Sequence, residues 1–146
     1  MQAVLFAIGN SLRRDDGVAH RVLTLVGPVA GVLTHDVMQL LPEHALQLAP
    51  AEQVFFIDAD TTVGKPHVES IPASVRSQSL AHSLLPEAVV ALSRKLYGFQ
   101  GKAYLCRVPG ADFSEGETLT ETAEENAAGA AHLLRQMLGC DDLPVH

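Results

Sequence analysis

Apolar and polar positions along the chain follow two patterns that succeed each other. Short apolar runs, typical of strands buried in a parallel sheet, recur between turn residues. Segments with apolar positions three or four apart, typical of helices, lie between those runs. Strands are expected at 3–8, 32–35, 54–57, 65–71 and 103–108, and helices at 18–26, 39–49, 83–97 and from Thr118 or Thr120 to a C-terminal cap at Gly139.

This alternation predicts an α/β fold, a three-layer α/β/α sandwich around a mostly parallel, twisted, five-stranded sheet. With 146 residues, we expect one domain spanning 1–146. A doubly wound strand order would place the first and third strands side by side. The loop after the first strand and Asp58, at the end of the third, would then share one crevice.

Charge and composition limit the classes of partner that we expect for this protein. The net charge is −7 and the ten Lys and Arg residues are scattered, so no basic patch suggests nucleic acid. No apolar run approaches the roughly 18 residues of a membrane span, and the chain enters its first strand without a basic leader. We expect a cytoplasmic monomer with no membrane partner, in which Cys106 and Cys140 are reduced thiols.

The polar loop at 9–17 joins the first strand to the first helix. Gly9 allows the backbone to turn sharply off the strand. Asp15 and Asp16 stand where the helix begins, and two interpretations are open for them: they cap the helix, or they belong to a functional site. Asn10 likewise either bonds its own turn or offers an amide to a bound peptide.

Three side chains should converge on the carboxyl edge of the sheet: Asp16 after the first strand, Asp58 at the end of the third, and His82 before the third helix. Two carboxylates and a neutral imidazole form a ligand set for a borderline divalent ion. The alternative is structural, because an Asp at a strand end often caps the next turn and a single His is often a solvated loop residue. No nucleophile elbow, P-loop or zinc-protease helix motif is present.

Four motifs, in order along nearly the whole chain, resemble the hydrogenase maturation endopeptidases. They are Gly9-Asn10-x-Leu12-x-x-Asp15-Asp16-Gly17, Asp58-Ala59, Ser79-x-x-His82-Ser83 before Leu85-Pro86-Glu87, and Asp112-Phe113-Ser114-x-Gly116-Glu117-x-Leu119-Thr120. The first motif, with its spacing, is the most specific of the four.

The resemblance implies an endopeptidase that removes the C-terminal extension of a [NiFe]-hydrogenase large-subunit precursor. Nickel, already inserted into that precursor, serves as the recognition mark, so the metal is expected to come with the substrate. The metal-contacting positions carry over as Asp16, Asp58 and His82, with Asp16 or Asp58 as the catalytic carboxylate. Many relatives have Glu at the first of these positions, and Asp is one methylene shorter.

A second departure lies after the second strand. Many relatives carry an Asp-Gly-Gly turn there, whereas this chain has Gln39-Leu40-Leu41-Pro42-Glu43. We expect Asn10, Gln39 and Glu43 to contact the substrate. For Glu43 the alternative is a charge at a helix N-terminus, and for the neighbouring His35 it is a surface position at a strand end.

Two other functions share these features. A non-catalytic chaperone that only binds the precursor would carry every motif. A magnesium-dependent phospho-acceptor signalling domain also combines an acidic pair after strand one with an Asp at the end of strand three. Against the signalling domain, the acidic pair follows Ile8 by several residues, and Arg107 rather than a lysine lies near the end of the last strand.

Overall fold

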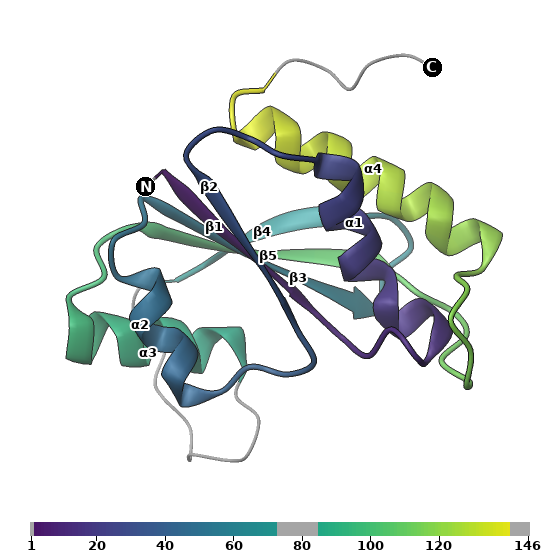
Figure 1. The fold of residues 1–146 in the computed structure, drawn as a ribbon, viewed down its shortest axis with the longest axis horizontal. Coiled ribbons are helices and arrows are strands. Elements are labelled where there is room, and N and C mark those ends of the chain that lie inside the picture. Colours follow the sequence, from purple (N-terminus) through teal and green to yellow (C-terminus); the bar gives the residue numbers. More distant parts are fainter. Residues whose placement is uncertain (1, 73–84, 141–146) are drawn as a thin grey trace.

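The computed structural model describes residues 2–72 and 85–140 and has the alternating order of strands and helices expected from the sequence (Figure 1). Its strands are β1 (Ala3–Ile8), β2 (Val32–Val37), β3 (Gln53–Asp60), β4 (His67–Ile71) and β5 (Lys102–Pro109). Its helices are α1 (Val18–Val26), α2 (Ala45–Leu48), α3 (Pro86–Tyr97) and α4 (Glu121–Met137), with two short 3-10 helices, η1 (Arg14–Gly17) and η2 (Pro42–His44).

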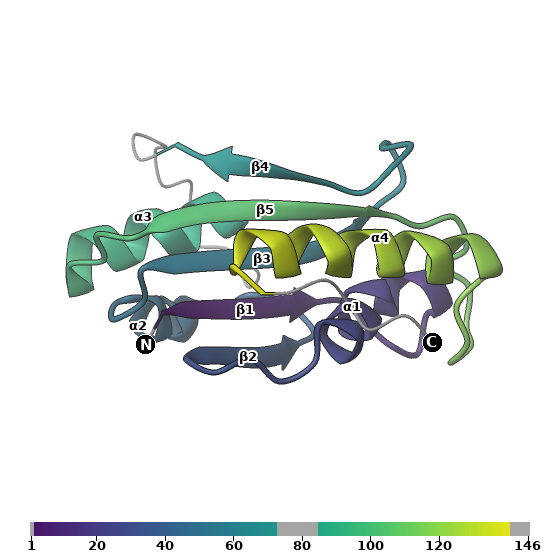
Figure 2. The same cartoon turned by 90° about the horizontal axis from the view of Figure 1, so that it is seen from above.

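The five strands form one sheet in the order β2-β1-β3-β5-β4 (Figure 2). All neighbours are parallel except β4, which runs antiparallel to β5 at the edge. The predicted neighbours β1 and β3 are adjacent, with Ile8 opposite Asp58. In the 2-1-3-4-5 order of the phospho-acceptor domains the fourth strand follows the third, whereas here β5 takes that place.

Helices cover both faces of the sheet, which confirms the three-layer sandwich (Figure 1). On one face α1 and α4 pack over side chains such as Leu5, Phe55 and Cys106. On the other face α2 and α3 pack over Phe6 and Phe56. Because successive strand residues point to opposite faces, the continuous apolar runs of β1 and β3 supply both cores.

The helix predicted at 39–49 is much shorter in the structure, and this prediction is wrong in extent. Leu41 is extended, as a residue before proline usually is, and its backbone N–H donates to Nδ1 of His44. The chain therefore turns first through η2 and then through the four-residue α2. β2 is longer than predicted, because pairing with β1 continues to Val37 opposite Ile8.

The other predicted boundaries agree within a few residues. Thr120 rather than Thr118 caps α4, with its hydroxyl accepting from the N–H of Ala123, and Gly139 follows the helix with φ 75°. The predicted helix start at Ser83 lies outside the described residues, and α3 is described from Pro86. Within 2–72 and 85–140, the helices are too short or too polar to cross a membrane.

Candidate functional site at the carboxyl edge of the sheet

The loop after β1 closes tightly on itself because Gly9 lies against Asp16. Gly9 has φ 146°, and a Cβ placed on it would lie 1.9 Å from the backbone oxygen of Asp16 and 3.7 Å from its carboxyl carbon. The N–H of Asn10 donates to Oδ2 of Asp16 at 2.8 Å. The carboxylate of Asp16 is therefore held beside the end of β1, on the Gly9–Asn10 peptide.

Asn10 bonds its own turn, which was one of the two interpretations open for it. Its side-chain Oδ1 accepts from the N–H of Leu12 at 2.9 Å. The residue also lines a groove of about 640 Å³ with Leu12, Arg13 and Phe113. Asn10 thus has a structural contact and faces a groove next to Asp16.

Asp58 lies in β3 between Ile8 of β1 and Arg107 of β5. Burial is the main cause that raises the pKa of Asp58 to about 6. A hydrogen bond from the N–H of Ala59 favours the charged form and so lowers this pKa in part. The negative charges of Asp16 and Asp60 raise this pKa further, and the cation of Arg107 lowers it. Asp58 stands opposite Ile8 at the end of β1, and Asp16 bonds the N–H of Asn10 two residues later, so both carboxylates singled out from the sequence lie at one edge of the sheet.

A small cavity opens beside Asp58. Its volume is about 120 Å³, and its lining includes Asp60, Leu85, Glu87 and Arg107. Arg107 is held by two carboxylates, Asp60 at 2.5 Å and Glu69. Two hydrogen bonds from Thr62, together with Arg107, lower the pKa of Asp60 to about 2, so this carboxylate stays charged beside the cavity. Sequence patterns could not reveal this ion-pair group, because its members Asp60, Glu69 and Arg107 lie on three different strands.

His82, the third residue of the predicted ligand set, lies outside the described residues. Across 2–72 and 85–140, no group of three or more His, Cys, Asp and Glu side chains could hold a metal ion. The described part of the site therefore supplies two carboxylates.

Three solved structures of similar shape are named for one activity. The hydrogenase 2 maturation peptidase of Thaumarchaeota archaeon SCGC_AB-539-E09 superimposes with a TM-score of 0.71 at 17% identity, over 97% of this chain and 100% of that one. The hydrogenase maturating endopeptidase HybD of E. coli gives 0.70 at 17% identity, over 99% and 98%. The [NiFe] hydrogenase maturation protease HycI of Thermococcus kodakarensis KOD1 gives 0.68 at 22% identity, over 94% and 92%.

This chain has the fold of the hydrogenase maturation peptidases. By sequence, no family model and no curated protein matches it. The fold likeness spans essentially the full length of both partners in each comparison. The α/β sandwich predicted from the sequence, and the family resemblance of its motifs, are thus supported by structure at low sequence identity.

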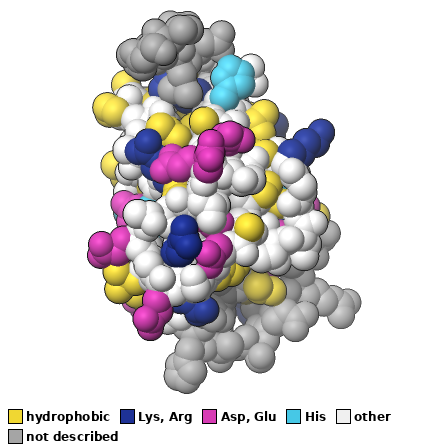
Figure 3. Space-filling model, turned by 90° about the vertical axis from the view of Figure 1, so that its right-hand side faces the viewer, with side chains coloured by type: hydrophobic (Ala, Val, Ile, Leu, Met, Phe, Trp, Pro, Cys, Tyr) yellow, Lys and Arg dark blue, Asp and Glu magenta, His cyan; other side chains and the backbone are white. Residues whose placement is uncertain are grey.

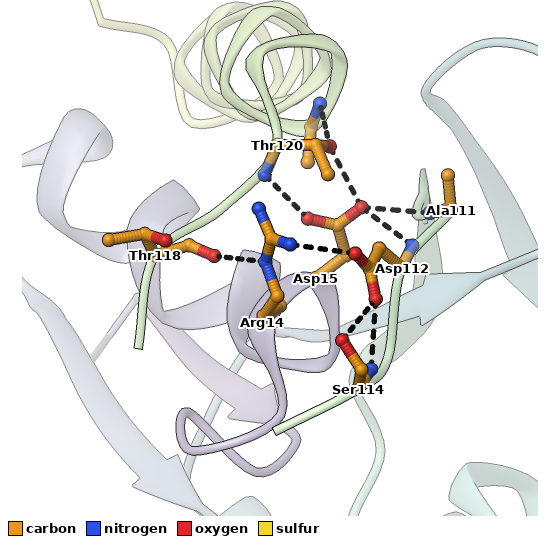
Figure 4. Close-up of polar contacts among 8 residues, drawn as sticks. Arg14, Asp15, Ala111, Asp112, Ser114, Thr118 and Thr120 are labelled. Atoms are coloured by element: carbon orange, nitrogen blue, oxygen red, sulfur yellow. Dashed lines mark hydrogen bonds and ion pairs between the residues drawn. The ribbon is translucent and has the colours of Figure 1, made fainter. Parts of the chain in front are cut away.

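In this maturation peptidase fold, Asp15 connects the loop after β1 with the segments that carry Ala111 and Thr120 (Figure 4). Its side chain is fully buried. One carboxylate oxygen accepts from the N–H groups of Ala111 and Asp112 and from the hydroxyl of Thr120, and the other accepts from the N–H of Thr120. Burial opposes the charge, but these hydrogen bonds outweigh it and lower the pKa of Asp15.

Of the two interpretations left open for Asp15 and Asp16, the structure does not support capping of the first helix. Neither η1 nor α1 has a side-chain hydrogen bond at its N-cap. Asp15 instead bonds to residues about a hundred positions later, and Asp16 bonds back to Asn10. Two adjacent acids thus have different environments: Asp15 is buried and structural, and Asp16 is half-buried at the candidate site.

The late motif around Asp112 packs against the loop after β1. Arg14 bonds Asp112 at 2.8 Å and the carbonyl oxygen of Thr118 at 3.1 Å (Figure 4). A parallel β-bridge joins Arg13 to Gly116. The first and last motifs of the sequence are therefore parts of one structure, which positions the loop that carries Asp16.

The remaining predicted substrate contacts lie farther out. Gln39 and Glu43 are exposed in the segment after β2, and Glu43 occupies the first turn of η2. His35 stacks on Phe6 with ring centroids 4.9 Å apart, and burial lowers its pKa. The structure thus brings Asn10, Asp16 and Asp58 together, and leaves Gln39 and Glu43 on the surface.

Proposed function

We propose that this protein is an endopeptidase that removes the C-terminal extension of a nickel-loaded [NiFe]-hydrogenase large-subunit precursor. The observation that carries the proposal is that Asp16 and Asp58 both lie at the carboxyl edge of β1 and β3 in a maturation peptidase fold. Ligands bind at this edge in open α/β sheets. The names of the structural neighbours supply the reaction and the kind of substrate.

The chemistry assigned to the site is hydrolysis by water. Nickel belongs to the substrate, and Asp16, Asp58 and His82 approach it and so align the scissile peptide bond in the crevice. A carboxylate with a pKa near 6, as Asp58 has, can accept a proton from the attacking water close to neutral pH. The amine of the released peptide then takes up a proton as it leaves. No covalent enzyme intermediate is required.

Exposed apolar side chains near the site support docking on a protein. Leu12, Met38 and Leu85 are 57%, 68% and 63% exposed, and they lie in segments that follow β1, follow β2 and precede α3. Acidic, basic and apolar side chains intermingle on this face of the molecule (Figure 3). Such a mixed surface suits a transient complex of a cytoplasmic monomer with its precursor, and nothing about it suits nucleic acid.

Precursor processing tests the proposal directly. The purified protein is incubated with nickel-loaded and nickel-free large-subunit precursors from the same organism, and intact mass spectrometry follows the precursor C-terminus. We expect loss of the extension only when nickel is loaded, and no loss with Asp16→Asn or Asp58→Asn. His82→Ala tests the third predicted ligand in the same assay.

A result without cleavage would favour another function. If authentic loaded precursors bind but stay intact, the protein is a chaperone with the fold of a peptidase. The Glu52→Gln variant is the control, since it removes an exposed carboxylate just before β3, at the opposite end of that strand from Asp58. Equal losses of processing in Glu52→Gln and Asp58→Asn would contradict a specific role for Asp58.

A further inference from the structure

His20 is the one side chain of α1 that connects the end of β2 with the loop after β1. Its Nε2 lies 2.8 Å from the carbonyl oxygen of Gly9. Its Nδ1 lies 2.6 Å from Oδ1 of Asp36. A carbonyl oxygen and a carboxylate only accept hydrogen bonds, so both contacts are complete when both ring nitrogens carry hydrogen.

The Gly9–Asn10 peptide group is consequently bound at both of its polar atoms. Its carbonyl oxygen accepts from His20, and its N–H donates to Oδ2 of Asp16 at 2.8 Å. The N–H of Gly9, on the preceding peptide group, donates to the carbonyl oxygen of Val37 at 3.0 Å. The orientation of this one peptide plane therefore decides where the Asp16 carboxylate is held.

A hydrogen bond to a carbonyl oxygen also polarises the N–H of the same peptide group. Donation from His20 to Gly9 should therefore strengthen donation from Asn10 to Asp16. Asp36 fixes the ring that makes this donation, since it holds the opposite nitrogen. The chain of contacts runs from Asp36 through His20 and one peptide group to Asp16.

We propose that His20, oriented by Asp36, is a positioning residue that sets the geometry of Asp16 through the Gly9–Asn10 peptide. The proposal rests on the proposed function, in which Asp16 approaches the substrate nickel. His20 itself touches neither the substrate nor Asp16. It lies one contact beyond the groups that bond a ligand directly, whose loss typically costs 10–100-fold in activity, so we expect an effect at the lower end of that range.

Two amide substitutions separate the contacts of His20. The amide of His20→Gln reaches as far as Nε2 and can still donate to Gly9. The amide of His20→Asn reaches as far as Nδ1, so it can meet Asp36 but not Gly9. Both variants are neutral and polar, so they differ in the one contact that matters. Arg21→Ala is the control on the same helix, because it removes only an exposed ion pair with Glu124.

The first measurement is the ¹⁵N–¹H spectrum of each variant at one pH, in the absence of substrate. The Asn10 amide proton reports its hydrogen bond to Asp16, and Asp16→Ala gives the shift for complete loss of that bond. We expect His20→Asn to move this proton toward the Asp16→Ala position. His20→Gln and Arg21→Ala should leave it near its wild-type position.

The second measurement is precursor processing with the same variants. We expect His20→Asn to slow cleavage roughly tenfold with unchanged precursor affinity, and His20→Gln to restore most of the rate. If His20→Asn leaves the Asn10 proton in place, or moves it without slowing cleavage, the proposal is overturned. Equal losses in the Gln and Asn variants would also overturn it.

The two proposals can fail separately. If Asp16→Asn processes the precursor normally, the proposed function of Asp16 is wrong, whatever the spectra show. If Asp16→Asn abolishes processing while the Asn10 proton is unaffected by His20→Asn, the proposed function stands and the positioning role of His20 falls.

Discussion

The charged form of Asp58 is unfavourable in the folded chain and lowers its stability. It is partly buried within a parallel sheet, and the negative charge of Asp16 lies nearby. Its pKa is raised from 3.8 to about 6. In the folded state the carboxylate is thus less favourable than in the unfolded chain, and stability is lost as the pH rises through this range.

The first prediction concerns this pH dependence. Well below pH 3.8 Asp58 is protonated in the folded and the unfolded chain, and near pH 8 it is charged in both. The free energy of unfolding of the wild type therefore falls by about 2–3 kcal/mol between these limits because of Asp58. We expect Asp58→Asn to lack this loss and to be the more stable protein near pH 8. Urea unfolding at a series of pH values measures the difference. Parallel curves for the wild type and Asp58→Asn would contradict the raised pKa.

Gly9 provides the second prediction. A Cβ at this position would overlap the backbone oxygen of Asp16, and φ 146° is unfavourable for any other residue. We expect Gly9→Ala to lower the free energy of unfolding by at least about 1–3 kcal/mol and to displace the loop that carries Asp16. The control is Gly64→Ala, since a Cβ there meets no atom within 4 Å. Equal denaturation midpoints for the two variants would refute the close approach.

At the scale of elements, α4 and the loop after β1 share one residue. The Thr120 hydroxyl accepts from the N–H of Ala123, as an N-cap does, and donates to Oδ2 of Asp15. Its backbone N–H donates to the other oxygen of Asp15. The start of the last helix is therefore fixed to the start of the first helical segment by a buried carboxylate.

The third prediction follows from this double contact. Thr120→Ala removes a helix cap, about 1 kcal/mol, and a hydrogen bond to a charged group, about 1.5–3 kcal/mol. We expect a loss of about 2–4 kcal/mol in the free energy of unfolding, measured by urea denaturation. Thr120→Ser keeps the hydroxyl and should lose less than about 1 kcal/mol. A Ser variant as unstable as the Ala variant would show that the methyl group, not the hydroxyl, matters.

At the scale of the whole molecule, we expect the carboxyl edge of the sheet, and not the opposite edge, to bind the precursor. Leu12 lies at the carboxyl edge, and Leu96 lies near the end of α3, which leads to the opposite edge. Both side chains are 57% exposed, so they are matched for surface area. We expect only the leucine at the carboxyl edge to contact the precursor.

The fourth prediction compares these two leucines. Leu12→Ser should weaken precursor binding roughly tenfold, because apolar area is no longer buried in the complex, and Leu96→Ser should leave it unchanged. Titration calorimetry with a loaded precursor, carried out in the Asp58→Asn background that is expected not to process it, measures both dissociation constants. If both variants bind as the wild type does, docking does not use this face.

Periodicity along the sequence was sufficient to predict the layers and the neighbouring β1 and β3, because both depend on local pattern and on a general rule of topology. It also placed Asp16 and Asp58 at one edge. It could not show that Asp15 is structural, since its hydrogen-bond partners lie at 111–120. Nor could it place β5 inside the sheet, between β3 and β4.

The position of β5 in the sheet has a consequence for folding during synthesis on the ribosome. β5, an interior strand, and the residues that bond Asp15 all come from the last third of the chain. While that part is still in the exit tunnel, the Asp16 loop lacks its support and β3 has no second neighbour. The loop that carries Asp16 can therefore take its folded shape only after residues 102–120 have left the ribosome, about a hundred positions after the loop itself.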